Sequence, residues 1–86
     1  MVVWKYSLTK ERTMLNMPVG ADVLDVQEQL GVIQLWALVN PEYAKEFRNF
    51  LVVGTGQPIS TKFDLKHVST ILLQGGTLVY HVFEII

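Results

Sequence analysis

Cysteine is absent from this chain of 86 residues, and charged residues make up only 17% of it. The lack of cysteine excludes a disulfide framework and a thiolate metal site, and it suits a reducing compartment. The seven lysines and arginines are scattered and the net charge is −1, so no basic stripe is available to bind nucleic acid. The apolar runs are too short to span a membrane, and Met1–Lys5 does not open a signal peptide. We therefore expect a cytoplasmic protein with neither a nucleic-acid nor a membrane partner.

Apolar residues, in contrast, are abundant and make up 50% of the chain. The length predicts one domain over residues 1–86. A domain of this size buries about 60% of the surface that its unfolded chain exposes, so its core cannot cover every apolar side chain. Exposed apolar patches usually mark interfaces. This surplus predicts a homo-oligomer.

Short segments rich in β-branched and aromatic residues predict strands along most of the chain. Turn signals separate them, chiefly Leu30-Gly31 and Gly75-Gly76. The expected strands are Val2–Tyr6, Thr13–Met17, Val23–Gln29, Val32–Val39, His67–Gln74 and Thr77–Ile86. In the third of them, Leu24 and Val26 are expected to share a face.

Residues 40–53 allow two interpretations. Asn40, Pro41 and Glu42 suit the start of a helix. The alternative is a turn over residues 40–45 and a strand over residues 46–53, which the β preference of Leu51–Val53 favours. With this strand, the pattern predicts a mainly β fold: a small antiparallel meander of six or seven strands that closes into a barrel or sandwich, with at most one short helical turn.

Catalytic and metal-binding patterns are hard to find. No Gly-x-Ser-x-Gly elbow occurs, and the two histidines, His67 and His81, belong to no clustered ligand motif. Seven carboxylates are candidates for acid–base chemistry, and only Glu84 interrupts an apolar segment: Asp22, Asp25, Glu28, Glu42, Glu46, Asp64 and Glu84. We therefore predict no catalytic residue, no metal and no cofactor.

The segment Val52–Pro58 carries the most specific binding signal. A Gly-x-Gly loop after a strand exposes backbone N–H groups that can hold an anion, and Arg48 is a fixed cation close by in sequence. The predicted ligand-binding set is Arg48, Gly54, Thr55, Gly56, Gln57 and His81. The simpler alternatives are a turn that needs positive φ, an exposed arginine, and a partly buried histidine that bonds a backbone carbonyl.

Two other features are expected to serve packing. Trp4 and Trp36 are predicted to fill the core, since Trp36 lies in a strand that is apolar on both faces. The final apolar segment, Val82–Ile86, is expected either to pair inside the sheet or to add to a neighbouring subunit.

Four segments follow one another over nearly the whole chain: Trp4–Tyr6, Trp36–Glu42, Val52–Ile59 and Gly75–Glu84. In this order they resemble a family of short bacteriophage and prophage proteins. Gln57 stands where the family has histidine, and Asn40 where it has aspartate. The resemblance implies a phage product that acts in the bacterial cytoplasm, but it implies no reaction.

Three functions are compatible with these observations. The first is a non-enzymatic phage accessory protein, such as a counter-defence factor, that captures a small anionic or nucleotide-like ligand. The second is an inhibitor that binds a host protein through an apolar surface or a β edge. The third, the least favoured, is a small enzyme.

Overall fold

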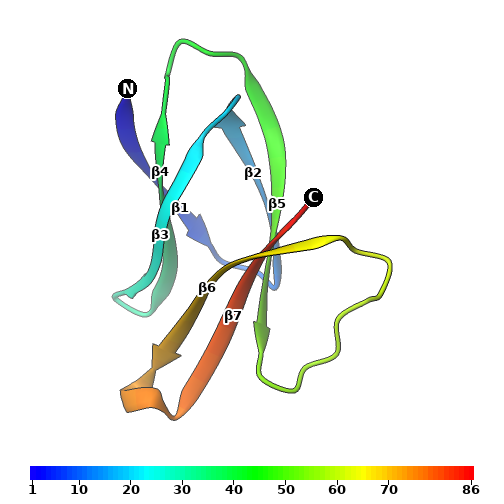
Figure 1. Ribbon diagram of the computed structural model, residues 1–86. Helices are drawn as coiled ribbons and strands as arrows, with labels where there is room; N and C mark the ends of the chain where they lie inside the picture. The colour runs from blue at the N-terminus through cyan, green and yellow to red at the C-terminus, as the bar shows by residue number, and fades with distance from the viewer.

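The chain folds into seven β-strands and one short 3-10 turn, as the computed structural model of residues 1–86 shows (Figure 1). The elements are β1 (Val2–Leu8), β2 (Arg12–Pro18), β3 (Asp22–Gln29), β4 (Val32–Val39), β5 (Lys45–Gly54), β6 (Leu65–Leu73), the 3-10 turn η1 (Gln74–Gly76) and β7 (Leu78–Ile85). The mainly β fold and the single helical turn are confirmed. The turn followed by a strand is also the correct interpretation of residues 40–53.

The strands form two antiparallel sheets with the orders β1-β4-β3 and β2-β5-β7-β6. The predicted meander is wrong, because only β3–β4 and β6–β7 pair as neighbours in the sequence. The chain instead passes from one sheet to the other after β1, β2 and β4. No strand pairing joins the two sheets, so they do not close into a barrel.

One hydrophobic core draws side chains from both sheets. Its members alternate along the strands, as expected for sheets with one buried face. They are Leu8, Leu15, Met17, Ala21, Val26, Leu35, Ala37, Val39, Phe50, Ile71 and Val82. Trp4 packs against this cluster as predicted. On β5 and β7 the members of this cluster are even-numbered, Phe50 and Val82, whereas Leu51 and Val53 are buried outside the cluster. This alternation decides which polar residues lie between the sheets.

Both predicted hairpin turns are present, and both use left-handed backbone. Leu30 and Gly31 have φ of 52° and 84°, as a two-residue turn with positive φ at both positions requires. The second turn is longer than the Gly75-Gly76 pair, because Gln74 also has positive φ and begins the 3-10 turn. These turns place two hairpin tips at the same end of the molecule (Figure 1).

Two side chains expected inside lie elsewhere. Trp36 is opposite Lys5 and Asp25 and only half-buried, on the outer face of the three-stranded sheet, and it is not part of the core. Leu24 is 50% exposed because a β-bulge between Val23 and Asp25 breaks the alternation of β3. Val26 is fully buried, so the two residues do not share the core face.

The C-terminal strand β7 pairs with β5 on one side and with β6 on the other. The backbone of Ile86 also donates to Asp64 O at 2.9 Å. Of the two expected arrangements, this chain adopts pairing inside its own sheet, which leaves β7 no free edge. The structure contains no helix with the length and hydropathy of a membrane span.

Candidate ligand-binding site

Arg48 lies on the inward face of β5, near the end of the core where β2 turns into β3. Its Nε and Nη2 donate to the two carboxylate oxygens of Glu84, at 2.6 and 2.8 Å, and its Nη1 donates to Ala21 O at 2.5 Å. The side chains of Arg48 and Glu84 are only 18% and 12% exposed. This two-point pairing matches the planar guanidinium to a carboxylate. It explains why an acid interrupts the apolar strand β7.

The electrostatics of this pair fix its charge state. The hydrogen bond to Glu84 raises the pKa of the Arg48 guanidinium above its ordinary value, and the charges of Glu84, Glu46 and Asp22 act in the same direction against desolvation. Arg48 is therefore cationic at any accessible pH. Its charge is already balanced by a carboxylate, so an incoming anion would have to compete with Glu84.

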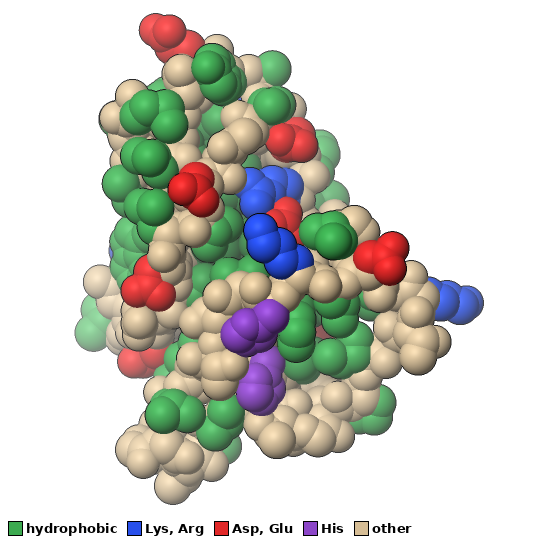
Figure 2. All heavy atoms as spheres, viewed as in Figure 1, with side chains coloured by type: hydrophobic (Ala, Val, Ile, Leu, Met, Phe, Trp, Pro, Cys, Tyr) green, Lys and Arg blue, Asp and Glu red, His purple; other side chains and the backbone are tan.

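The glycine loop lies at the other end of β5, about 20 Å away at the usual rise per residue. Thr55 Oγ1 shares a 2.7 Å hydrogen bond with His81 Nε2, and His81 Nδ1 is 3.2 Å from Thr70 Oγ1. His67 Nε2 is 3.0 Å from the same Thr70 hydroxyl. The two histidines lie side by side on the surface (Figure 2). This cluster ties the loop to β7 and β6 on the outer face of the four-stranded sheet.

The Thr55–His81 contact is not a catalytic triad in this arrangement. A hydroxyl beside an imidazole is the pair that nucleophilic catalysis uses, but the third group is then normally a carboxylate that holds the ring. Here that position is taken by the hydroxyl of Thr70. We therefore interpret the cluster as a set of hydrogen bonds that hold the loop against β6 and β7.

Gln57 extends from the same loop in the opposite direction. Its Oε1 accepts a hydrogen bond from Gly54 N at 3.1 Å, and its Nε2 donates to Glu11 Oε1 at 2.7 Å. Gly56 has φ of 86°, the left-handed conformation that the turn interpretation required. Gln57 thereby joins the β5–β6 loop to the β1–β2 connection.

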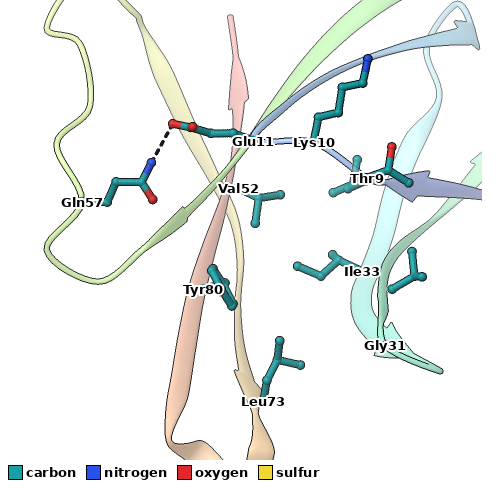
Figure 3. Close-up of a pocket in the computed structure, with 11 residues that line it drawn as sticks. Thr9, Lys10, Glu11, Gly31, Ile33, Val52, Gln57, Leu73 and Tyr80 are labelled. Atoms are coloured by element: carbon teal, nitrogen blue, oxygen red, sulfur yellow. Dashed lines mark hydrogen bonds between the residues drawn. The ribbon is translucent and has the colours of Figure 1, made fainter.

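These two segments form the rim of the largest hollow in the protein, a pocket of about 530 Å³. It opens between the two sheets at the end where the hairpin tips lie. Tyr80, Val52, Ile33 and Leu73 line its apolar part, below the Gln57–Glu11 hydrogen bond (Figure 3). Lys10 stands at the rim with its amine directed away from the apolar residues. A smaller hollow at the hairpin tips shares Gly31 and Leu73 with it.

A family model described as a domain of unknown function (DUF7352) matches residues 1–86. The chain belongs to this family. No curated protein and no solved structure matches it.

The structure divides the predicted site residues among three places. Thr55 and His81 come together on the outer face of the sheet, and Gln57 reaches the rim of the pocket. Arg48 lies at the far end of β5, apart from the loop. Gly54 and Gly56 shape the turn that carries Thr55 and Gln57, and a Cβ on Gly54 would lie 3.9 Å from the ring of Tyr80.

The sequence interpretation missed the residues that line the pocket. Tyr80 directly precedes His81, and strand alternation sends the two side chains to opposite faces. Glu11 and Lys10 stand in a polar link that carries no motif, and Glu11 is not one of the predicted acid–base candidates. Only the pairing of distant strands shows that this link approaches Gln57.

Proposed function

We propose that this DUF7352 domain is a non-enzymatic binding protein for a small anionic ligand with a flat ring, such as a nucleotide. The observation that carries the proposal is the pocket between the sheets. Its volume of about 530 Å³ falls within the range of small-molecule sites, which are mostly apolar with a few polar groups. A ring would lie on the apolar residues beside Tyr80, and a charged group would remain at the rim.

Lys10, rather than Arg48, is the cation in this proposal. Arg48–Glu84 is the only ion pair in the protein, so the charge of Arg48 is balanced and that of Lys10 is not. Lys10 also lies on the rim of the pocket, with Gln57 and Glu11 nearby. A flexible ammonium on an exposed segment can turn toward a phosphate without losing a protein partner.

The biological setting follows from the resemblance to phage and prophage proteins. A cytoplasmic phage accessory protein that sequesters a nucleotide-like signal would counter a host defence that uses this signal.

The test is a thermal-shift and calorimetry screen against nucleoside monophosphates and signalling dinucleotides. A ligand present at about 100 times its Kd stabilises the folded state by about 2.7 kcal/mol, which raises the Tm of a domain this small by about 10 °C or more. Lys10→Gln should weaken binding about fivefold and Tyr80→Leu by at least as much. Lys62→Gln, in a loop away from the pocket, is the matched control and should bind as the parent does.

Failure of every nucleotide at about 1 mM to move the Tm would exclude this ligand class. Equal weakening by Lys10→Gln and Lys62→Gln would show a general charge effect and remove the pocket from the proposal.

A second candidate function is inhibition of a host protein through a β edge. Strand edges are normally protected by charges or bulges. β3 and β6 each carry a bulge, and β1 carries Lys5 at its centre. β2 has neither in its interior, and its Met14 is 59% exposed. An extended segment of a partner would add to β2, and Met14→Lys should abolish that capture while leaving nucleotide binding unchanged.

A further inference from the structure

The outer face of the three-stranded sheet presents an apolar centre between two charged borders. On the central strand β4, Trp36 and Leu38 point outward and are half-buried. Val3 on β1 is 53% exposed beside them. Hydrophobic side chains gather along the side of the molecule formed by this sheet (Figure 2, left). An aromatic residue in the middle of an outer sheet face is a feature of interfaces.

The strand register places opposite charges on the two sides of Trp36. Lys5 of β1 lies opposite Trp36, and so does Asp25 of β3. The bulge in β3 adds the half-exposed Leu24 to the same stretch. In the backbone register the row therefore runs from a lysine through an indole to a carboxylate, while the Lys5 amine itself reaches across β4 to Gln29 of β3.

We propose that this face binds a second copy of the chain, with a two-fold axis parallel to β4 that passes beside Trp36. The inference is independent of the pocket. A rotation about such an axis turns the sheet over and exchanges its two borders while it keeps the level of each row. Lys5 of each copy then faces Asp25 of the other, and the two Trp36 rings meet on the axis.

The geometry of sheet packing permits these contacts. Face-packed sheets lie about 10 Å apart, with strand directions within about 30°. A lysine side chain and an aspartate from opposing sheets reach across that gap, and two indoles fill it in an offset or edge-to-face arrangement. An axis perpendicular to the strands would instead set Lys5 against Lys5 and Asp25 against Asp25. The charge pattern therefore selects one of the two symmetric arrangements.

The partners that Lys5 and Asp25 have within one chain are uncharged. Lys5 Nζ donates to Gln29 Oε1 at 3.0 Å, and no carboxylate pairs with it. Asp25 Oδ1 accepts from Val26 N at 2.8 Å and its Oδ2 from Gln27 Nε2 at 3.2 Å. Neither charge is balanced by an ion pair, so a second copy supplies what the single chain lacks.

The test measures mass by light scattering during size-exclusion chromatography, with loading concentrations up to about 1 mM. The parent should reach twice the chain mass of 9.8 kDa. Lys5→Glu places two acids together, and Asp25→Lys places two lysines together, so each variant alone should remain at the mass of one chain. An equimolar mixture of the two variants restores both charge pairs and should return to twice the mass.

Lys62→Glu and Asp64→Lys form the matched control, because both change the same charges in the β5–β6 loop. They should associate as the parent does, alone and mixed. Circular dichroism verifies folding, and if Asp25→Lys unfolds, Asp25→Asn keeps the acceptor for Val26 N and should weaken the dimer by at least fivefold. A parent that stays at 9.8 kDa throughout overturns the proposal. Single variants that dimerise as the parent does, or a mixture of folded variants that stays monomeric, overturn it equally.

Discussion

The two ends of the space between the sheets differ in what lines them. At one end, Arg48 and Glu84 form a two-point ion pair with a contact to Ala21 O, and only a smaller hollow of about 210 Å³ remains beside them. At the other end, Val52 and Tyr80 face a pocket of about 530 Å³ that no side chain fills. A charge directed inward is therefore a structural element here, and the proposed binding site lies at the opposite end, where polar groups remain at a rim.

The largest effect is expected at the end that holds Arg48 and Glu84. Arg48→Met leaves the Glu84 carboxylate nearly buried without its partner, and breaking a buried pair in this way costs about 3 kcal/mol. The double variant Arg48→Met/Glu84→Leu removes both charges, and its free energy of unfolding should lie within about 1 kcal/mol of that of the parent. Urea titrations of the three proteins provide the free energies.

Arg12→Met is the control for loss of an arginine, since Arg12 is exposed and lies over the Phe63 ring at 5.4 Å without an ion pair. It should cost less than about 1 kcal/mol. If the double variant is as unstable as Arg48→Met, the attraction between Arg48 and Glu84 itself stabilises the fold, and the loss does not come from a carboxylate left without a partner. The contrast between the two ends is then lost.

Two valines that pair across β5 and β7 sharpen the comparison. Val82 is fully buried, whereas Val52 is only partly buried and lines the pocket. Val82→Ala should cost about 2–3 kcal/mol, because it removes two methyl groups and leaves a cavity. Val52→Ala should cost about 1 kcal/mol, since the hollow already exists there. Equal losses in chemical denaturation would mean that the pocket is closed in solution.

Tyr6 tests a polar atom that lacks a partner. Its hydroxyl oxygen is buried and makes no hydrogen bond, so Tyr6→Phe should increase stability by about 1 kcal/mol. Desolvation raises the pKa of Tyr6. Above a pH of about 10 the unfolded chain loses this proton before the folded chain does, so the stability falls as the pH rises further. Tyr6→Phe should reduce that alkaline loss in urea titrations at pH 7 and at about pH 10.5, and an unchanged slope would show that other groups cause it.

The smallest effect concerns the loop that borders the pocket. Thr55→Val removes the 2.7 Å hydrogen bond to His81 and should cost about 0.5–1 kcal/mol. Amide hydrogen exchange should accelerate over residues 55–57 and remain unchanged in β3, which lies in the other sheet. Uniform acceleration would instead indicate a global loss of stability.

Local sequence patterns predicted the strands and turns well, because alternation and turn chemistry act over a few residues. Leu30-Gly31 required positive φ, and the β preference of Leu51–Val53 outweighed the helix signal at Asn40. The site was predicted less well. Arg48 and the Gly54 loop are close in sequence, but six residues of extended strand hold them far apart.

The errors share one physical cause, which is that non-local pairing decides which face of a strand is buried. The meander failed because β1 pairs with β4 and β2 with β5. Trp36 faces outward because one side of β4 already provides Leu35 and Ala37 to the core, and alternation sends the indole to the other side. No local signal distinguishes the two sides of so apolar a strand.

The sequence by itself determined the β-rich class, the positions of the strands and both hairpin turns, since each depends on residues that are neighbours in the chain. Only the tertiary structure decided the order of the strands, the partner of Arg48 and the pocket, where Glu11 meets Gln57 across 46 positions. Contacts of that separation are set by how two sheets bury a common core, and a pattern read along the chain does not contain them.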